Sequence, residues 1–463
     1  MRQRVGRLLG TLAAAALALG ASDPAPGRVD WGLVNTIVKR IEPPQIPLRE
    51  YRVDRVQDAS GAPGNARPAI LSAIDKIAAG GGGRIILGKG TWRSDGPIHL
   101  KSRIALHLEE GAVLLFSPDP AHYLPVVKVR WEGTEALSYS PLVYARDVED
   151  VAITGLGIID GNAESQFHAW HAKAEPDFQR LRKLGFDGAP LEQRVFGAGT
   201  HLRPSLIQIH GARRVLLEGF TARNSPFWVN HLVYAENVTV RGVKVESRFP
   251  NNDGVDIDSS RYVLVEGCTF RTGDDSVVVK SGRDLDGRRI AKPSEYVVVR
   301  NNDMGGEDGI ALGSEMSGDI RYVFFTDNVL RSGASAVRFK ANLDRGGTVE
   351  HIGVRRFKVG SFKTFLWFQL DYPSELGGNF PSTYRDIVFE DIAIEDVETL
   401  FEARAPAAAP LRDVLLRNVS AASAKTPVVG EHVTGLRFVN VTVGGKNVDE
   451  LAAPYAGAPA RGK

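Results

Sequence analysis

The chain has 463 residues, with 57 Lys and Arg against 55 Asp and Glu and a formal net charge of +2. This near balance argues against a nucleic-acid-binding protein, which would carry a basic stripe on its surface. The apolar content of 43% is that of a globular protein with a full core, and 49 glycines suit a fold with many tight turns.

Residues 1–22 have the pattern of a secretory signal peptide. Arg2, Arg4 and Arg7 form a basic start, an apolar run covers residues 8–19, and small residues follow at 20–22. The apolar run is short for a membrane span, and an uncleaved anchor is the alternative. We therefore expect a secreted or periplasmic protein that has no contact with a membrane after signal removal.

The segment that follows the signal contains one helical pattern. Residues 23–66 are Pro-rich and are expected to form a leader or first cap. Ile70, Ile74 and Ile77 then recur at helical spacing, and a glycine run ends the pattern. One helix ahead of many strands is what a solenoid needs to close the open end of its core, so we predict a short N-terminal capping helix.

Beyond residue 83 the sequence repeats one short pattern: a turn residue, alternating apolar residues, then Gly, Asn or Asp. The copies recur at a spacing of roughly 22 to 26 residues, which is typical of a β-solenoid. A β-sandwich would not repeat so regularly, and no helical patterns alternate with the strands as a βαβ fold requires. We predict an all-β solenoid that forms a single domain over residues 23–463. The inserts at 164–202 and 363–384 would flank a groove, and residues 452–463 would form a flexible tail.

Five acidic residues lie at matching places in three successive segments of this repeat. They are Asp253 in NNDGVD, Asp274 and Asp275 in GDDSVVVK, and Glu307 and Asp308 in GGEDGIALGSE. Residues one coil apart are neighbours in a solenoid, so the register places Asp253, Asp275 and Asp308 in one column. Like charges held close together are costly, which indicates that the cluster serves function rather than folding.

The cluster fits the acid-catalysed cleavage of a glycosidic bond. One carboxylic acid would protonate the leaving oxygen while other carboxylates activate water. Crowding raises at least one carboxyl pKa and keeps that group protonated. Arg338 and Lys340 on the next coil would hold an anionic substrate beside the acids. Two alternatives stay open: a structural role of the Asp residues in solenoid turns, and a calcium site.

The same motifs resemble the polygalacturonase family, glycoside hydrolase family 28. The resemblance covers most of the chain and includes Asn251-Asn252-Asp253, Gly273-Asp274-Asp275 and Arg338-Phe339-Lys340, together with strings such as RWEG, KSGRDLDGRR and GSEMSG. It implies a right-handed parallel β-helix that hydrolyses galacturonan-type pectin with inversion and without a metal or other cofactor. A monomer acting on an acidic polysaccharide or oligosaccharide is expected.

The resemblance also implies a role for each matching residue. Asp274 corresponds to the general acid, and Asp253 and Asp275 to the pair that activates water. Arg338 and Lys340 correspond to a clamp for a uronate carboxylate. Acid and base carboxyls in inverting enzymes stand roughly 6.5–9.5 Å apart.

Two positions qualify this assignment. The family's Gly-His-Gly motif is replaced by Gly306-Glu307-Asp308, which makes the substrate subsite less favourable for a negatively charged sugar. Glu307 is therefore a candidate substrate-binding residue, and a rhamnogalacturonan or other pectic side chain is an alternative substrate. His231, in NSPFWVNHLVY, is a candidate groove residue, with a core histidine as the alternative. A calcium-dependent polysaccharide lyase and a non-catalytic glycan-binding solenoid remain as rival functions.

Overall fold

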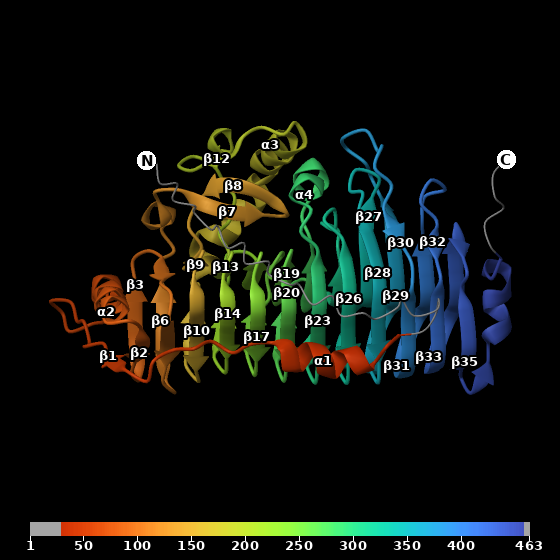
Figure 1. The fold of residues 1–463 in the computed structure, drawn as a ribbon, viewed down its shortest axis with the longest axis horizontal. Coiled ribbons are helices and arrows are strands. Elements are labelled where there is room, and N and C mark those ends of the chain that lie inside the picture. The colour runs from red at the N-terminus through yellow and green to blue at the C-terminus, as the bar shows by residue number, and fades with distance from the viewer. Residues whose placement is uncertain (1–28, 458–463) are drawn as a thin grey trace, which may run out of the picture.

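The computed structural model describes residues 29–457, so the expected signal peptide lies outside the described part of the chain. Parallel pairing joins each strand to the strand one coil later and builds the long stack of coils seen in Figure 1. Asp258 pairs with Lys280 and Val277 with Ile310, in the register expected from the sequence. The predicted parallel β-helix is confirmed.

The coils form three faces. The face that carries the acidic cluster consists of β4 (Ile98–Leu100), β9 (Val143–Arg146), β13 (Ile207–His210), β16 (Asn230–Val233), β19 (Val255–Asp258), β22 (Val277–Lys280), β25 (Asp308–Leu312) and the second half of β27 (Val329–Asn342).

The second face consists of β1 (Glu50–Arg52), β2 (Gly83–Leu87), β5 (Ile104–Leu108), β10 (Glu149–Gly155), β14 (Arg213–Glu218), β17 (Glu236–Arg241), β20 (Arg261–Glu266), β23 (Ser294–Arg300), β26 (Ile320–Thr326) and β28 (Thr348–Arg355). The third consists of β3 (Gly90–Ser94), β6 (Ala112–Phe116), β11 (Ile158–Asp160), β15 (Thr221–Arg223), β18 (Lys244–Ser247), β21 (Thr269–Thr272), β24 (Asp303–Gly305) and the start of β27. Longer strands complete the last coils: β29 (Lys358–Tyr372), β31 (Ile387–Arg404), β33 (Val414–Glu431) and β35 (Arg437–Val443).

The core is a set of apolar columns that run through the coils. Leu232, Ile257, Val279 and Leu312 stack in successive coils and are all buried. The column continues into Phe339, whose ring stacks on that of Phe368 at 4.4 Å. Because each coil buries its apolar residues only against the coils beside it, the open ends need covers.

Both ends of the stack are covered. The helix α2 (Arg67–Ala79) buries Ile70, Ile74 and Ile77 against the first coils, which confirms the predicted capping helix. At the other end, the 3-10 helix η5 (Asp449–Tyr455) packs on β35 and buries Ala452. Residues 452–457 are thus part of the last turn of structure rather than of a flexible tail.

Part of the expected leader lies along the side of the stack rather than over its end. The helix α1 (Gly32–Arg40) lies along the outside of the coils, where Figure 1 shows it crossing the second face near the middle of the stack. Val34 and Ile37 are buried there against Leu264, Val298 and Phe324. The physical reason is that these three residues point outward from the second face and need an apolar partner.

Between β11 and β13, an insert forms a separate layer above the cluster face. It contains η2 (Ala163–Ser165), η3 (Phe167–Lys173), α3 (Glu175–Phe186), η4 (Leu191–Gln193) and β12 (Val195–Phe196). The strand β12 joins the hairpin of β7 (Val127–Trp131) and β8 (Thr134–Ser138) in a small sheet. The helix α4 (Asp284–Ile290) rises beside them, and together they overhang the face in Figure 1.

Removing the anchor of α1 should destabilise the protein without affecting the cluster. We expect Ile37→Ala to lower the free energy of unfolding by about 2–5 kcal/mol, because Ile37 is fully buried. Urea unfolding followed by circular dichroism measures this, with the exposed neighbour Thr36→Ala as the control. Equal stability of the two variants would show that α1 does not dock as described.

Candidate active site

Tight turns ahead of the strands place the acidic residues. Asp253 lies two residues before β19, Asp275 lies two residues before β22, and Asp308 begins β25. The strand register therefore stacks all three in one column and continues it into Ser335, as expected from the sequence. Asp274 precedes this column by one residue, at the edge of the face.

Glycine and a buried amide allow these turns to approach closely. A Cβ atom on Gly273 would lie 2.2 Å from the carbonyl oxygen of Phe249, so only glycine fits there. Asn252 is buried, and its amide donates to the carbonyl oxygens of Ser225 and Phe227 at 3.1 and 3.0 Å. The middle residue of the Asn-Asn-Asp motif thus holds the turn that presents Asp253.

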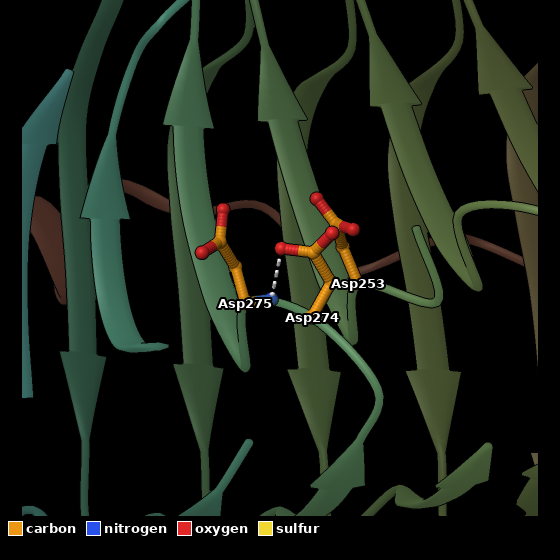
Figure 2. A group of neighbouring side chains, drawn as sticks. All are labelled: Asp253, Asp274 and Asp275. Carbon is orange, nitrogen blue, oxygen red and sulfur yellow. Dashed lines mark hydrogen bonds between the residues drawn. The ribbon is translucent and has the colours of Figure 1, made fainter. Parts of the chain in front are cut away.

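Three carboxylates converge in this arrangement. Oxygens of Asp253, Asp274 and Asp275, one from each, all lie within 4.8 Å of one another, and Figure 2 shows the three groups side by side on neighbouring coils. Asp274 accepts from the backbone N–H of Asp275 at 3.0 Å and from that of Asn251 at 3.3 Å. Asp253 and Asp275 are buried, whereas Asp274 is partly exposed.

Burial and crowding keep part of this cluster protonated. Burial, followed by the charges of Asp256, Asp274 and Asp275, raises the pKa of Asp253 well above its usual range. Burial also raises the pKa of Asp275 to about 7, with Lys340 opposing the shift and Asp274 adding to it. The cluster can therefore hold a proton at a pH at which an exposed aspartate has lost it.

The two predicted cations lie beside the column. Lys340 donates to both oxygens of Asp275 at 2.9 and 3.0 Å, and Arg338 donates to Asp308 at 2.9 Å. Although burial opposes ionisation, Lys340 and Arg338 hold the pKa of Asp308 below its usual range. Asp308 is therefore an ionised, buried partner of both cations.

Glu307 and His231 lie differently from the other candidates. Glu307 is exposed at the surface. Partial burial, followed by the negative charges of Asp274 and Asp308, raises its pKa. His231 is fully buried, so, contrary to the expectation, it does not line the groove. Its ring lies beneath Trp228, at 2.9 Å from the amide of Gln208 and 3.4 Å from Asp258, which leaves it a positioning role.

The acidic cluster lines a pocket with a volume of about 170 Å³, and further charged residues line the same pocket. Lys280 forms an ion pair with Glu315 at 3.0 Å, and Arg283 pairs with Glu315 at 2.6 Å and Glu132 at 3.0 Å. Although burial opposes ionisation, Lys280, Arg283 and Arg345 hold the pKa of Glu315 well below its usual range. These residues form a wall of ion pairs beside the acidic cluster in the same pocket.

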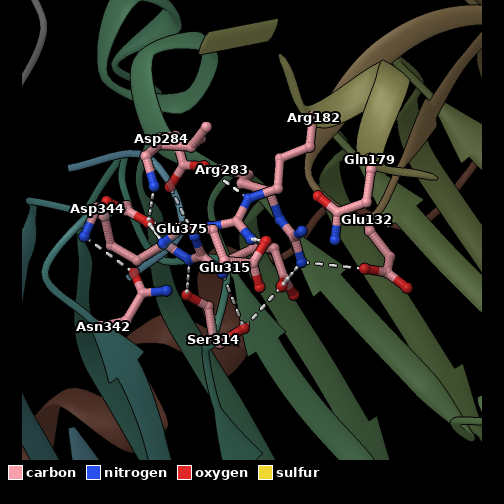
Figure 3. A network of polar contacts seen from close by, with 12 residues as sticks. Glu132, Gln179, Arg182, Arg283, Asp284, Ser314, Glu315, Asn342, Asp344 and Glu375 are labelled. Carbon is pink, nitrogen blue, oxygen red and sulfur yellow. Dashed lines mark hydrogen bonds and ion pairs between the residues drawn. The ribbon is translucent and has the colours of Figure 1, made fainter. Parts of the chain in front are cut away.

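That wall continues into a buried network that joins α3, α4 and two loops. Arg182 of α3 pairs with Asp344 at 3.1 Å, with Asp284 of α4 at 3.4 Å and with Glu375 (Figure 3). Asp344 also accepts three backbone N–H groups from the loop after β29, including that of Glu375 at 2.8 Å. Side chains from four separate segments are therefore joined in one network beside the pocket.

The wall residues were not identified from the sequence. Glu132, Arg283 and Glu315 lie in the strings RWEG, KSGRDLDGRR and GSEMSG, which carry the family resemblance but do not predict a role for these residues. A charged residue within each string was the available signal. The pairing of Glu132 with Arg283, 151 positions away, depends on how the β7–β8 hairpin folds over the face.

The carboxylate cluster could also hold a cation, because Asp253, Asp274 and Asp275 offer three oxygens at suitable separations. Lys340 already contacts both oxygens of Asp275, however, and supplies positive charge at that side of the cluster. The ammonium group thus does part of the work that a divalent ion would do.

Comparison with known proteins gives one consistent result. The family model of the glycosyl hydrolases family 28 matches residues 192–445. A probable polygalacturonase of Vitis vinifera is 31% identical over 383 residues, which cover 81% of this chain and 69% of that protein. An exo-poly-alpha-D-galacturonosidase of Dickeya chrysanthemi is 26% identical over 73% of this chain and 61% of that protein.

A solved structure agrees with these matches over nearly the whole chain. The crystal structure of a hyperthermoactive exopolygalacturonase from Thermotoga maritima superposes with a TM-score of 0.86 at 36% identity, covering 91% of this chain and 98% of that one. No helix within residues 29–457 is long and apolar enough to cross a membrane. The chain belongs to glycoside hydrolase family 28 and is a polygalacturonase-like enzyme that hydrolyses O-glycosyl bonds.

Proposed function

We propose that this enzyme releases sugar units from the ends of galacturonan-type pectin chains by inverting acid/base hydrolysis. The observation that carries the proposal is the convergence of Asp253, Asp274 and Asp275 beside Lys340, within a pocket that charged loops wall off at one end. A secreted or periplasmic monomer that needs no metal fits this activity.

Each carboxylate has a distinct part in the proposed mechanism. Asp274 is the most exposed of the three and lies at the edge of the pocket, where it can protonate the leaving glycosidic oxygen. Asp253 and Asp275 lie deeper, and together they orient and deprotonate the attacking water. Burial raises the pKa of both Asp253 and Asp275, so whichever of the two is ionised is a stronger base toward the water than an exposed aspartate, while the other can hold a proton.

The spacing of these groups sharpens the mechanism. One oxygen of each group lies within 4.8 Å of one on the others, which is closer than the roughly 6.5–9.5 Å between the acid and base carboxyl groups of most inverting enzymes and near the roughly 5–5.5 Å of retaining ones. We infer that the water is held beside the acid by two carboxylates rather than across a wide gap from one. The anomeric configuration of the first product is therefore the decisive observable.

Attack at chain ends is supported by the walled pocket. Arg182, Asp284, Asp344 and Glu375 tie α3, α4 and the loop after β29 together at one end of the groove. We infer that this network blocks the passage of a polymer on that side, so that a chain end would bind. The structural relative from Thermotoga maritima is an exopolygalacturonase by its title, which agrees with this mode.

The hydrolase mechanism predicts a severe loss of activity in Asp274→Asn. An amide cannot donate the catalytic proton, so we expect kcat to fall by about 10²–10⁴-fold. Release of reducing ends from oligogalacturonates measures this, with Asp327→Asn as a matched control whose carboxylate pairs with Arg356 on the outside of the coils. Undiminished turnover in Asp274→Asn would exclude the mechanism, and product that absorbs ultraviolet light would indicate a lyase.

The buried cluster predicts that Asp253→Asn stabilises the fold more as the pH rises. The folded pKa of Asp253 lies above its unfolded value, so stability is lost as the pH rises toward the folded pKa. Asn has no such loss. Thermal unfolding at about pH 5 and about pH 8 should show a larger gain in Tm at the higher pH.

The control for this pH effect has the opposite sign. The pKa of Asp327 is lowered by its hydrogen bond with Arg356, so the pair stabilises the fold above the unfolded pKa of Asp327 and is lost at lower pH. Asp327→Asn should therefore not raise the Tm at about pH 8. A gain in Tm for Asp253→Asn that is independent of pH would contradict the assignment.

Breaking the network around Arg182 should change the products of the reaction. Arg182→Met leaves two buried carboxylates with fewer partners, which we expect to cost about 3–5 kcal/mol and to loosen the wall. Chromatography of early products should show oligosaccharides where the native enzyme gives single sugar units.

Two further variants frame this result. Glu375→Gln removes only the outer member of the network and should shift the products less. Lys183→Met lies on the same helix in an exposed pair with Asp187 and should leave the products unchanged. Identical products from all three variants would show that the wall does not set the mode of attack.

A further inference from the structure

Asp308 is the carboxylate that pairs with both Arg338 and Lys340. It is fully buried, and its Oδ2 lies 2.9 Å from Arg338 and 3.3 Å from Lys340. Its other oxygen, Oδ1, is buried without a hydrogen-bond partner among the described residues. The buried Asp308 carboxylate therefore contacts Arg338 and Lys340 from the inner side of the site.

Arg338 has little donor capacity left for a substrate. One of its terminal nitrogens donates to Asp308, and the other donates to Gln369 and, at 2.9 Å, to the hydroxyl of Tyr372. Its Nε is buried without a hydrogen-bond partner among the described residues, and the guanidinium plane lies over Trp367 at 4.3 Å. A second carboxylate would have to displace one of these protein acceptors to form a bidentate pair.

Lys340 is occupied in the same way. Its ammonium group contacts both oxygens of Asp275 and lies within ion-pair distance of Asp308. The two cations thus face two carboxylates, and a third carboxylate, Asp274, lies next to them. The subsite has no surplus positive charge to offer a uronate.

We propose that Asp308 makes the Arg338–Lys340 subsite select a pyranose that lacks an ionised carboxylate, such as a methyl-esterified galacturonate or a neutral sugar. This inference rests on the proposed function, because it assigns the sugar that binds beside the proposed acid Asp274. An ionised uronate there would bring a further negative charge against Asp274, Asp275 and Asp308, and like charges at this distance are strongly unfavourable. An ester or a hydroxyl group avoids that repulsion.

The test compares matched oligosaccharides that differ only at the sugar next to the cleaved bond. One set has free galacturonate at this position, a second has its methyl ester, and a third has rhamnose in a rhamnogalacturonan repeat. We expect wild-type kcat/KM to favour at least one uncharged set over the free galacturonate set by about tenfold. The set that is preferred then distinguishes the ester from the neutral sugar.

The variant Asp308→Asn keeps the shape of the side chain and removes its charge. We expect it to raise kcat/KM for the free galacturonate set relative to the uncharged sets by about tenfold. Asp327→Asn makes the same chemical change on the outside of the coils and should leave the ratio unaltered. A wild type that prefers free galacturonate, or a ratio that Asp308→Asn does not move, overturns the inference.

The failure of this inference can be told apart from the failure of the proposed function. If wild type hydrolyses the free galacturonate set best, the hydrolase stands and the role of Asp308 is wrong. If wild type hydrolyses none of the three sets, the proposed function itself fails. The wild-type comparison needs no variant, so it decides the question even if Asp308→Asn does not fold.

Discussion

The structure depends on one constraint, which is that coils stacked in register place equivalent residues about 4.8 Å apart. For apolar residues this spacing builds the core, as in the column that runs through Leu232, Ile257 and Val279. For carboxylates the same spacing is unfavourable, because each coil adds a charge next to the last one. Asp253, Asp275 and Asp308 form such a column, and much of the surrounding chemistry compensates for it.

Compensation takes two forms in the pocket. On the column itself, Lys340 pairs with Asp275 and Asp308, while burial leaves Asp253 with a raised pKa. Beside the column, Lys280 and Arg283 share Glu315, and Arg283 also pairs with Glu132, so these residues offset one another's charges. The carboxylates thus lie close enough together for proton transfer, and enough of their charge is neutralised for the protein to fold.

The repeat in the sequence made the fold and the column predictable. Strand register follows from a period that is visible in the residues, and the apolar spacing of Ile70, Ile74 and Ile77 predicted the capping helix. The docking of α1 was missed because Leu264 and Val298 sit within continuous apolar runs, in which an outward residue cannot be told from an inward one. In a strand that alternates apolar and polar residues, an additional apolar residue on the outward side would have been recognisable in the sequence.

The site was predictable where it depends on register and not where it depends on inserts. Asp253, Asp274, Asp275, Arg338 and Lys340 come together as expected. The register predicted that Asp308, and not Glu307, shares the column of Asp253 and Asp275, and Asp308 is buried there whereas Glu307 is exposed.

His231 and the wall were beyond the reach of the sequence. His231 lies on the cluster face, but the layer above that face covers it through Trp228. The position of Glu132 over the pocket likewise depends on how far the β7–β8 hairpin bends. Both are set by contacts between segments distant in the chain.

The most direct test of the central claim is the configuration of the first product. Proton NMR of an oligogalacturonate during early turnover reports whether the new reducing end has the opposite configuration to the bond that was cut. Water activated by Asp253 and Asp275 beside the acid Asp274 predicts inversion in the first turnovers, before mutarotation. Retention would show that one of these carboxylates attacks the sugar directly, and it would contradict this account.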